Sequence, residues 1–88
     1  MTGGTISRQP GVVEAQFDDI RVVLNEDLAY LGLDEVGQRV WDLLEEPRSL
    51  DGVVGALLEE YDVDRATCER DVAAFVAALE QHKLVTRG

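Results

Sequence analysis

Five pairs of adjacent carboxylates are the residues whose types and spacing could most readily do chemistry. Asp18–Asp19, Glu26–Asp27, Asp34–Glu35, Glu45–Glu46 and Glu59–Glu60 could in principle chelate calcium or share a proton. None of the pairs shows the alternating ligand spacing of a calcium-binding loop. We therefore interpret them as solvated turns and helix ends, and we expect neither a metal nor a cofactor.

The single cysteine and the single histidine offer little for catalysis. Cys68 falls on a predicted apolar helix face, where a thiol usually has a structural role. His82 lies beside Lys83 near a predicted helix end, and no nucleophile neighbours it in sequence. A Gly-rich phosphate loop is also missing from the sequence. The sequence therefore predicts a protein that is not an enzyme.

The composition indicates one small acidic domain. The chain has 88 residues, 45% of them apolar, and 18 acidic against 8 basic residues give a formal net charge of −10. Such a charge repels phosphate backbones and anionic lipids, so we expect neither nucleic acid nor a membrane as a partner. The sequence has no apolar run of roughly 18 residues and no signal peptide, which predicts a cytoplasmic location.

Residues 12–33 carry the pattern of three short strands. Val12–Phe17 and Ile20–Leu24 are rich in β-branched residues, and Leu28–Leu33 is a third apolar segment. The acidic pairs between these segments suit turns. An antiparallel meander is predicted. Residues 1–10 contain glycine and proline but little apolar surface, so we expect them to be a disordered tail before one domain at 11–86, with residues 86–88 fraying.

Helical periodicity follows the strands. A first helix is predicted over about residues 35–45, before Pro47. Ser49 is a candidate N-cap for a second helix and Asp64 for a third, the longest. The expected fold is α+β, a three-stranded antiparallel sheet followed by three helices, similar to a winged helix. Trp41 and Tyr61 are expected in its core.

The third predicted strand lacks the usual defences of an edge strand. Between Leu28 and Leu33 it has no lysine, proline or charge. If this strand is an edge beside the third helix, the two would form a groove in which an extended peptide could add by β-augmentation. The candidate peptide-binding residues are Leu28, Ala29, Tyr30, Leu31, Gly32, Asp71, Ala74, Phe75 and Ala78. Ala73, Val76 and Ala77 lie towards the other side of the helix, and periodicity alone leaves either side open.

Free-energy magnitudes constrain the ligand of such a groove. Ordering six residues costs roughly 6–12 kcal/mol of backbone entropy, whereas each net hydrogen bond contributes about 1 kcal/mol. The ligand should therefore bring two or more apolar anchors, each contributing about 2–3 kcal/mol when buried.

Ile20 to Val85 resembles the PqqD-like family, also called RiPP recognition elements, which bind leader peptides of ribosomally made, modified natural products. The matching residues are Leu33–Gly37, Val40–Leu44, Ser49–Leu50, Leu57–Val63, Glu69–Val72, Phe75, Leu79, Leu84 and Val85. The resemblance implies that a leader adds antiparallel to the third strand and rests on the third helix. Family members often have glycine in place of Pro47 and Lys83, which puts the local helix caps in question.

Within this family, a free-standing chain with a Trp-containing first helix looks more like the leader-binding subunit of lasso-peptide maturation than like the pyrroloquinoline-quinone peptide chaperone, which remains an alternative. The implied partners are a precursor leader peptide, a cysteine-protease leader peptidase and the cyclase.

Two alternatives rest on the fold order and on the open strand edge. A winged-helix nucleic-acid-binding module would need a basic recognition helix, yet Arg65 and Arg70 are outnumbered by acids in the third helix. A dimer joined through the exposed strand edge would need no other partner.

Overall fold

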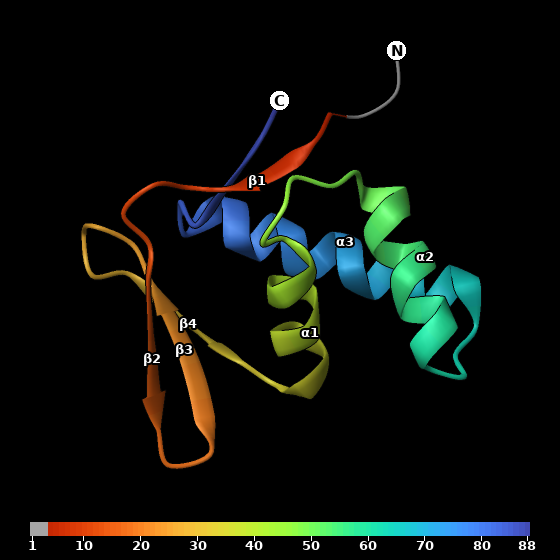
Figure 1. Cartoon of the computed structure of the whole chain (residues 1–88), viewed down its shortest axis with the longest axis horizontal. Helices are drawn as coiled ribbons and strands as arrows, with labels where there is room; N and C mark the ends of the chain where they lie inside the picture. The colour runs from red at the N-terminus through yellow and green to blue at the C-terminus, as the bar shows by residue number, and fades with distance from the viewer. Residues whose placement is uncertain (1–3) are drawn as a thin grey trace.

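The computed structural model describes residues 4–88, so residues 1–3 of the expected tail lie outside the described part. Over these residues four strands precede three helices, and a fifth strand ends the fold (Figure 1). The strands are β1 (Ile6–Arg8), β2 (Val13–Phe17), β3 (Ile20–Leu24), β4 (Tyr30–Leu33) and β5 (Val85–Arg87), and the helices are α1 (Glu35–Leu43), α2 (Leu50–Glu60) and α3 (Arg65–Gln81). The predicted α+β class is confirmed, and "winged-helix-like" describes it loosely.

The predicted meander is present as a sheet with the order β2-β3-β4. Val23 pairs with Glu14 on one side and with Leu31 on the other, both antiparallel. The β2–β3 turn is tight because Asp18 adopts a left-handed φ of 55°, which aspartate tolerates better than most residues. The meander leaves β4 as an edge strand, and Figure 1 shows the helices gathered on one side of the sheet.

Side-chain caps define where the three helices begin. Asp34 accepts a hydrogen bond from Gly37 N at 2.7 Å, Ser49 from Gly52 N at 3.0 Å, and Asp64 from Thr67 N at 3.1 Å. Each bond satisfies a backbone N–H that a helix start otherwise leaves open. The predicted caps at Ser49 and Asp64 are therefore confirmed.

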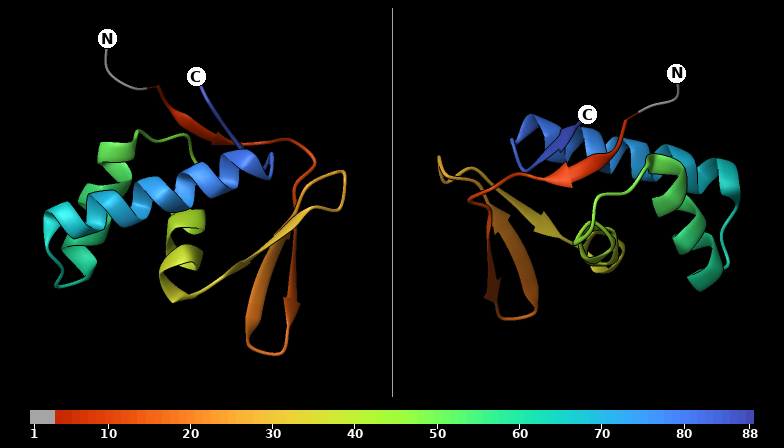
Figure 2. Two further views of the ribbon diagram at one scale, coloured as in Figure 1. Left: turned by 180° about the vertical axis from the view of Figure 1, so that it is seen from behind. Right: turned by 45° about the horizontal axis from the view of Figure 1, so that its top comes forward.

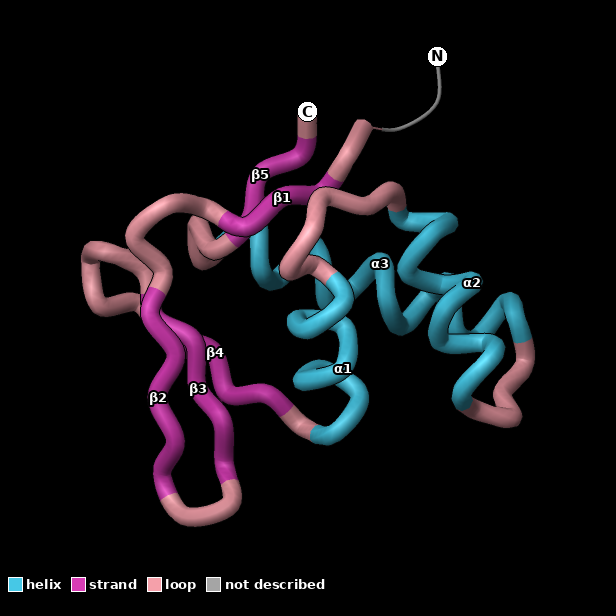
Figure 3. Tube along the Cα trace, in the orientation of Figure 1, coloured by secondary structure: helices cyan, strands magenta, loops and turns pink. Residues whose placement is uncertain are grey.

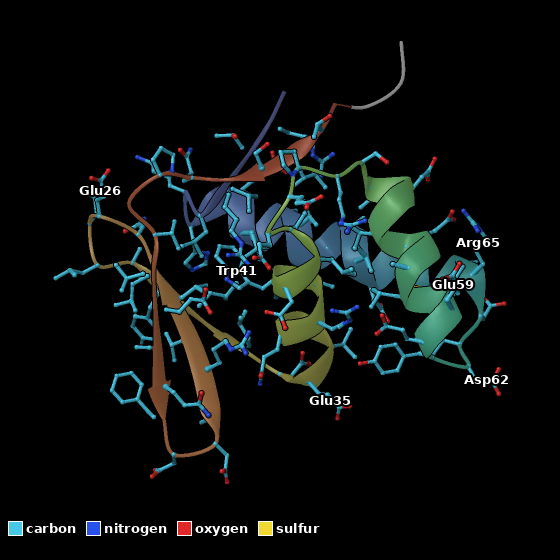
Figure 4. All side chains as sticks on the ribbon, viewed as in Figure 1. Glu26, Glu35, Trp41, Glu59, Asp62 and Arg65 are labelled. Atoms are coloured by element: carbon cyan, nitrogen blue, oxygen red, sulfur yellow. The ribbon has the colours of Figure 1, made fainter. Side chains whose placement is uncertain are left out.

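The core lies where the three helices meet the inner face of the meander. Trp41 is 1% exposed and points into this core from α1 (Figure 4), as predicted, whereas Tyr61 is only partly buried against it. The guanidinium of Arg8 stacks over the Trp41 ring, with 4.3 Å between Cζ and the ring centroid. The other buried core residues are Ile6, Val23, Leu33, Val40, Leu43, Leu44, Val53, Val54, Leu57, Cys68, Val72, Val76, Leu79, Leu84 and Val85.

Two predictions about the chain ends were wrong. Residues 6–8 form β1, which pairs with β5 although residues 86–88 were expected to fray (Figure 3). Ile6 is 0% exposed, and its backbone also bonds that of Arg48 in both directions, at 2.7 and 3.1 Å. The burial of the Ile6 side chain and the backbone bonds of β1 to β5 and to Arg48 together offset the entropy of ordering this segment, whose composition suggests disorder. The fold therefore begins before the boundary expected at residue 11.

Asn25 joins the meander to the end of α3. Its side-chain oxygen accepts hydrogen bonds from Asp27 N at 2.8 Å and Ala29 N at 3.0 Å, which shape the β3–β4 turn. Its amide nitrogen donates to the carbonyl of His82 at 2.6 Å. Because Asn25 is buried, water cannot easily replace these partners. The amide therefore fixes where β4 starts relative to the end of α3.

Helix α3 ends in a Schellman motif. Lys83 N donates to Glu80 O at 3.0 Å and Leu84 N to Leu79 O at 2.9 Å, while both leucines are buried. Lys83 adopts a φ of 57°, the left-handed conformation that glycine occupies most easily. The lysine thus stands where the resemblance placed a glycine, and the cap is kept at the expense of some backbone strain.

Over residues 4–88, no helix combines the length and the apolar character that crossing a membrane requires.

We expect Asn25→Asp to lower the free energy of unfolding by about 2–3 kcal/mol. The carboxylate keeps both acceptor bonds of the turn but loses the donor to His82 O and brings a negative charge to the negative end of the α3 dipole. Urea denaturation measures the change. Glu26→Gln, in the same turn but exposed, should stay within about 0.5 kcal/mol of the wild type, and an equal effect of both variants would show that Asn25 has no special role.

We expect Lys83→Gly to raise the free energy of unfolding by about 1 kcal/mol, because glycine adopts the left-handed conformation without steric cost. Thermal or urea denaturation tests this expectation. Gln81→Gly, inside the last turn of α3, should instead lower stability by about 1 kcal/mol. A loss of stability in both variants would contradict a strained cap.

Candidate functional site

The outer edge of β4 is open. Strand β4 pairs with β3 on one side, and within the described residues no strand pairs with its other side. An open edge presents backbone N–H and C=O groups to an incoming strand. The strand then leads directly into α1 (Figure 2). In α1, Gln38 Nε2 donates to Leu33 O at 3.3 Å. This contact fastens the end of the open edge to the first helix.

A hollow of about 280 Å³ lies where β4 ends, between α1 and α3. Its α1 side consists of Asp34, Val36, Gly37 and Val40, and its α3 side consists of Asp71, Val72 and Phe75. The helices approach closely because Gly37 has no side chain. A Cβ there would lie 3.2 Å from the Phe75 ring and 3.0 Å from Asp34 Oδ1. We call this space the first hollow.

The four predicted residues of α3 lie on or next to the helix face that points towards the first hollow. Asp71, Phe75 and Ala78 follow one another at one-turn spacing, so they share a stripe, with Ala74 beside it. Asp71 and Phe75 line the first hollow. Ala77 lies on another face of α3 and is exposed. The structure therefore places the predicted side of the helix, and not the Ala77 side, next to the hollow.

The five predicted residues of the strand segment, 28–32, do not all face the same way. Leu28 is in the turn, with a left-handed φ of 66°, and Ala29 precedes the strand. Tyr30 and Gly32 point to the outer face of the sheet, whereas Leu31 packs towards the core. Strand β4 therefore offers its backbone to the groove, and Leu31 is the member of this set whose side chain lies on the helical side.

Sequence reasoning missed the α1 side of the first hollow: Asp34, Val36, Gly37 and Val40. Val36 lies in the first turn of α1 and is 44% exposed. A valine in the first turn beside a glycine was the available signal, but an ordinary packing position gives the same pattern.

The rim of the first hollow is acidic. Asp34 caps α1, while Asp71 lies 3.8 Å from Arg70, a contact between two exposed side chains that is worth about 0–1 kcal/mol. Arg39 is engaged elsewhere, by hydrogen bonds of 2.6 and 2.7 Å to the carboxylate of Glu60. These bonds raise the pKa of Arg39 and lower the pKa of Glu60. The Asp71 carboxylate is therefore available to a cation on a ligand.

The outer face of the meander is a separate apolar surface. By register, alternate side chains place Val13, Phe17, Ile20 and Tyr30 on it, and all four are exposed. Arg21 points to the other face, where Nη1 donates to Asp42 Oδ1 at 2.8 Å. The outer face therefore carries exposed apolar groups with no charge among them, a pattern typical of interaction surfaces.

Within residues 4–88 no group of three or more His, Cys, Asp or Glu side chains could hold a metal ion. Cys68 is buried, in agreement with the structural role expected of it.

Comparisons with known proteins found related structures and a family. The structure "TbiB1 in Complex with the TbiA(beta) Leader Peptide" matches with a TM-score of 0.78 and 42% sequence identity, over 90% of this chain and 93% of that one. "Lasso peptide synthetase B1 complexed with the leader peptide" matches with a TM-score of 0.73 and 30% identity, over 92% and 96%. No curated protein sequence matches significantly. The family profile "Coenzyme PQQ synthesis protein D (PqqD)" matches residues 21–85, and the chain therefore belongs to the PqqD family.

Proposed function

We propose that this chain is a non-catalytic adaptor that binds the leader peptide of a ribosomally synthesised, post-translationally modified precursor, in particular a lasso peptide, and presents it to maturation enzymes. The open edge of β4, running into the first hollow between α1 and α3, is the observation that carries this proposal. Two relatives of 42% and 30% identity, each in complex with a leader peptide, support it.

The leader adds as a strand antiparallel to β4 and rests on the Asp71–Phe75–Ala78 stripe of α3. Backbone pairing with β4 supplies net hydrogen bonds of about 1 kcal/mol each, which ordering the peptide largely cancels. Affinity then depends on side chains that enter the first hollow, where the apolar groups of Val36, Val40, Val72 and Phe75 can bury them. The free leader is disordered and folds on binding.

Presentation uses the outer face of the meander. This apolar surface lies on the opposite side of the sheet from the helices, so a leader held between β4 and α3 leaves it open. We assign it to the maturation enzymes, first the leader peptidase and then the cyclase. Acidic turns at Asp18–Asp19 and Glu26–Asp27 stand at its two ends, so the matching surface should be apolar with a basic rim.

Ala78→Glu should weaken leader binding at least tenfold, about 1.4 kcal/mol, because it puts a carboxylate on the helix face that the peptide covers. Isothermal titration would use two synthetic leaders, that of TbiA(beta) and that of the precursor encoded beside this chain. Ala77→Glu adds the same charge on an exposed position of another face and should change affinity less than twofold. Equal affinities of the two variants would mean that the peptide does not lie along this stripe.

Phe17→Ser combined with Ile20→Ser should leave leader affinity unchanged but slow leader removal by the peptidase more than tenfold. The two side chains pair across the β2–β3 hairpin on the outer face, where Phe17 is 63% exposed. Cleavage of the precursor is followed by mass spectrometry with purified peptidase. Gln16→Ser, on the inner face of the same hairpin, serves as the control. If the peptidase cleaves the precursor at the wild-type rate with the double variant, the outer face has no role in presentation.

A further inference from the structure

A second hollow, of about 120 Å³, continues the first one towards the start of α3. Its own walls are Leu57 and Tyr61 from the end of α2, Val63 from the following loop, and Thr67 and Cys68 from α3. The two hollows share Val36, Asp71 and Val72. They therefore form one trough that follows α3 from its middle towards its N-terminus, while the opposite wall changes from α1 to the end of α2.

The direction of a peptide on β4 decides which of its residues reach this second hollow. Strand β4 ends at Leu33, beside the first hollow. A peptide antiparallel to β4 runs the other way, so its N-terminal part lies next to Asp34 and the start of α1. Residues that precede its strand-forming segment then continue along α3 into the second hollow.

The chemistry of the second hollow defines what it takes. Its lining is apolar apart from the hydroxyls of Tyr61 and Thr67 and the carboxylate of Asp71. Val36 and Val63, on its two sides, are 44% and 47% exposed, so a ligand would remove apolar surface from water. With less than half the volume of the first hollow, it suits one aliphatic side chain of about leucine size.

The surroundings of the second hollow favour a positively charged neighbour of that side chain. Glu35 and Asp62 are exposed on either side of this region and point outward (Figure 4). The nearby Arg65 bonds Glu69 at 3.2 Å, and Arg39 bonds Glu60. A basic residue on the peptide therefore meets the carboxylates of Glu35 and Asp62, and at the junction of the two hollows it meets Asp71, whose contact with the exposed Arg70 is long at 3.8 Å.

We propose that the second hollow is a specificity subsite for the N-terminal flank of the leader, which takes one aliphatic side chain beside a basic residue that faces Asp71. This inference rests on the proposed function, because it extends the same peptide beyond β4. A second copy of this chain is a poor occupant, since two chains with a formal net charge of −10 each repel one another.

The test compares two leaders, each in two lengths, on the wild type and two variants. The probes are the TbiA(beta) leader and the leader encoded beside this chain, each complete or shortened from its N-terminus up to the strand-forming segment. Val63→Asp places a carboxylate in the wall of the second hollow only. Ala66→Asp adds the same charge nearby, on an exposed residue that lines neither hollow. Dissociation constants are measured by fluorescence anisotropy.

Val63→Asp should weaken binding of the complete leader about tenfold and leave the affinity for the shortened leader at the wild-type value. Unchanged binding of the shortened leader also shows that the variant is folded. Ala66→Asp should change both affinities less than twofold. Equal binding of complete and shortened leaders by the wild type, or equal weakening of both by Val63→Asp, would overturn the subsite alone. Failure of every leader to bind the wild type would overturn the proposed function and the subsite with it.

Discussion

The side-chain amide of Asn25 connects the two elements between which a peptide would lie. Its oxygen accepts hydrogen bonds that shape the turn before β4, and its nitrogen donates to the carbonyl of His82, the C-cap of α3. An edge strand and a helix form a useful groove only when their separation is fixed, because a peptide must reach both at once. A buried amide with three satisfied bonds fixes that separation better than apolar contacts, which tolerate sliding.

The opposite end of the groove is set by a close approach and not by a hydrogen bond. Gly37 lets the first turn of α1 come against the Phe75 ring, and Asp34 both caps α1 and forms the rim of the first hollow. The same residues therefore end the strand, start the helix and shape the proposed binding surface. A change in any of them would alter the site through the backbone as well as through lost contacts.

The three-stranded sheet has two surfaces with different tasks in this proposal. Its edge and inner side belong to the groove, while its outer face carries the exposed apolar residues. Because alternate residues of a strand point to opposite faces, binding a leader along β4 and docking an enzyme on the sheet do not compete for the same side chains. Such an arrangement allows a small chain to hold both partners together.

Local pattern in the sequence was enough to predict much of the fold. Segments rich in β-branched residues predicted the meander, and Ser49 and Asp64 predicted where two helices begin. These predictions were possible because a strand period, a helix period and an N-cap are properties of neighbouring residues. The sequence also indicated a peptide-binding edge at residues 28–33, where charge and proline are missing.

What only the tertiary structure decided depends on residues far apart in the chain. The pairing of β1 with β5 joins the two ends, the bond from Asn25 to His82 spans 57 positions, and the trough combines α1, α2 and α3. None of these contacts produces a periodic pattern in the sequence, because each depends on how helices and strands pack against one another and not on the spacing of residues within one element.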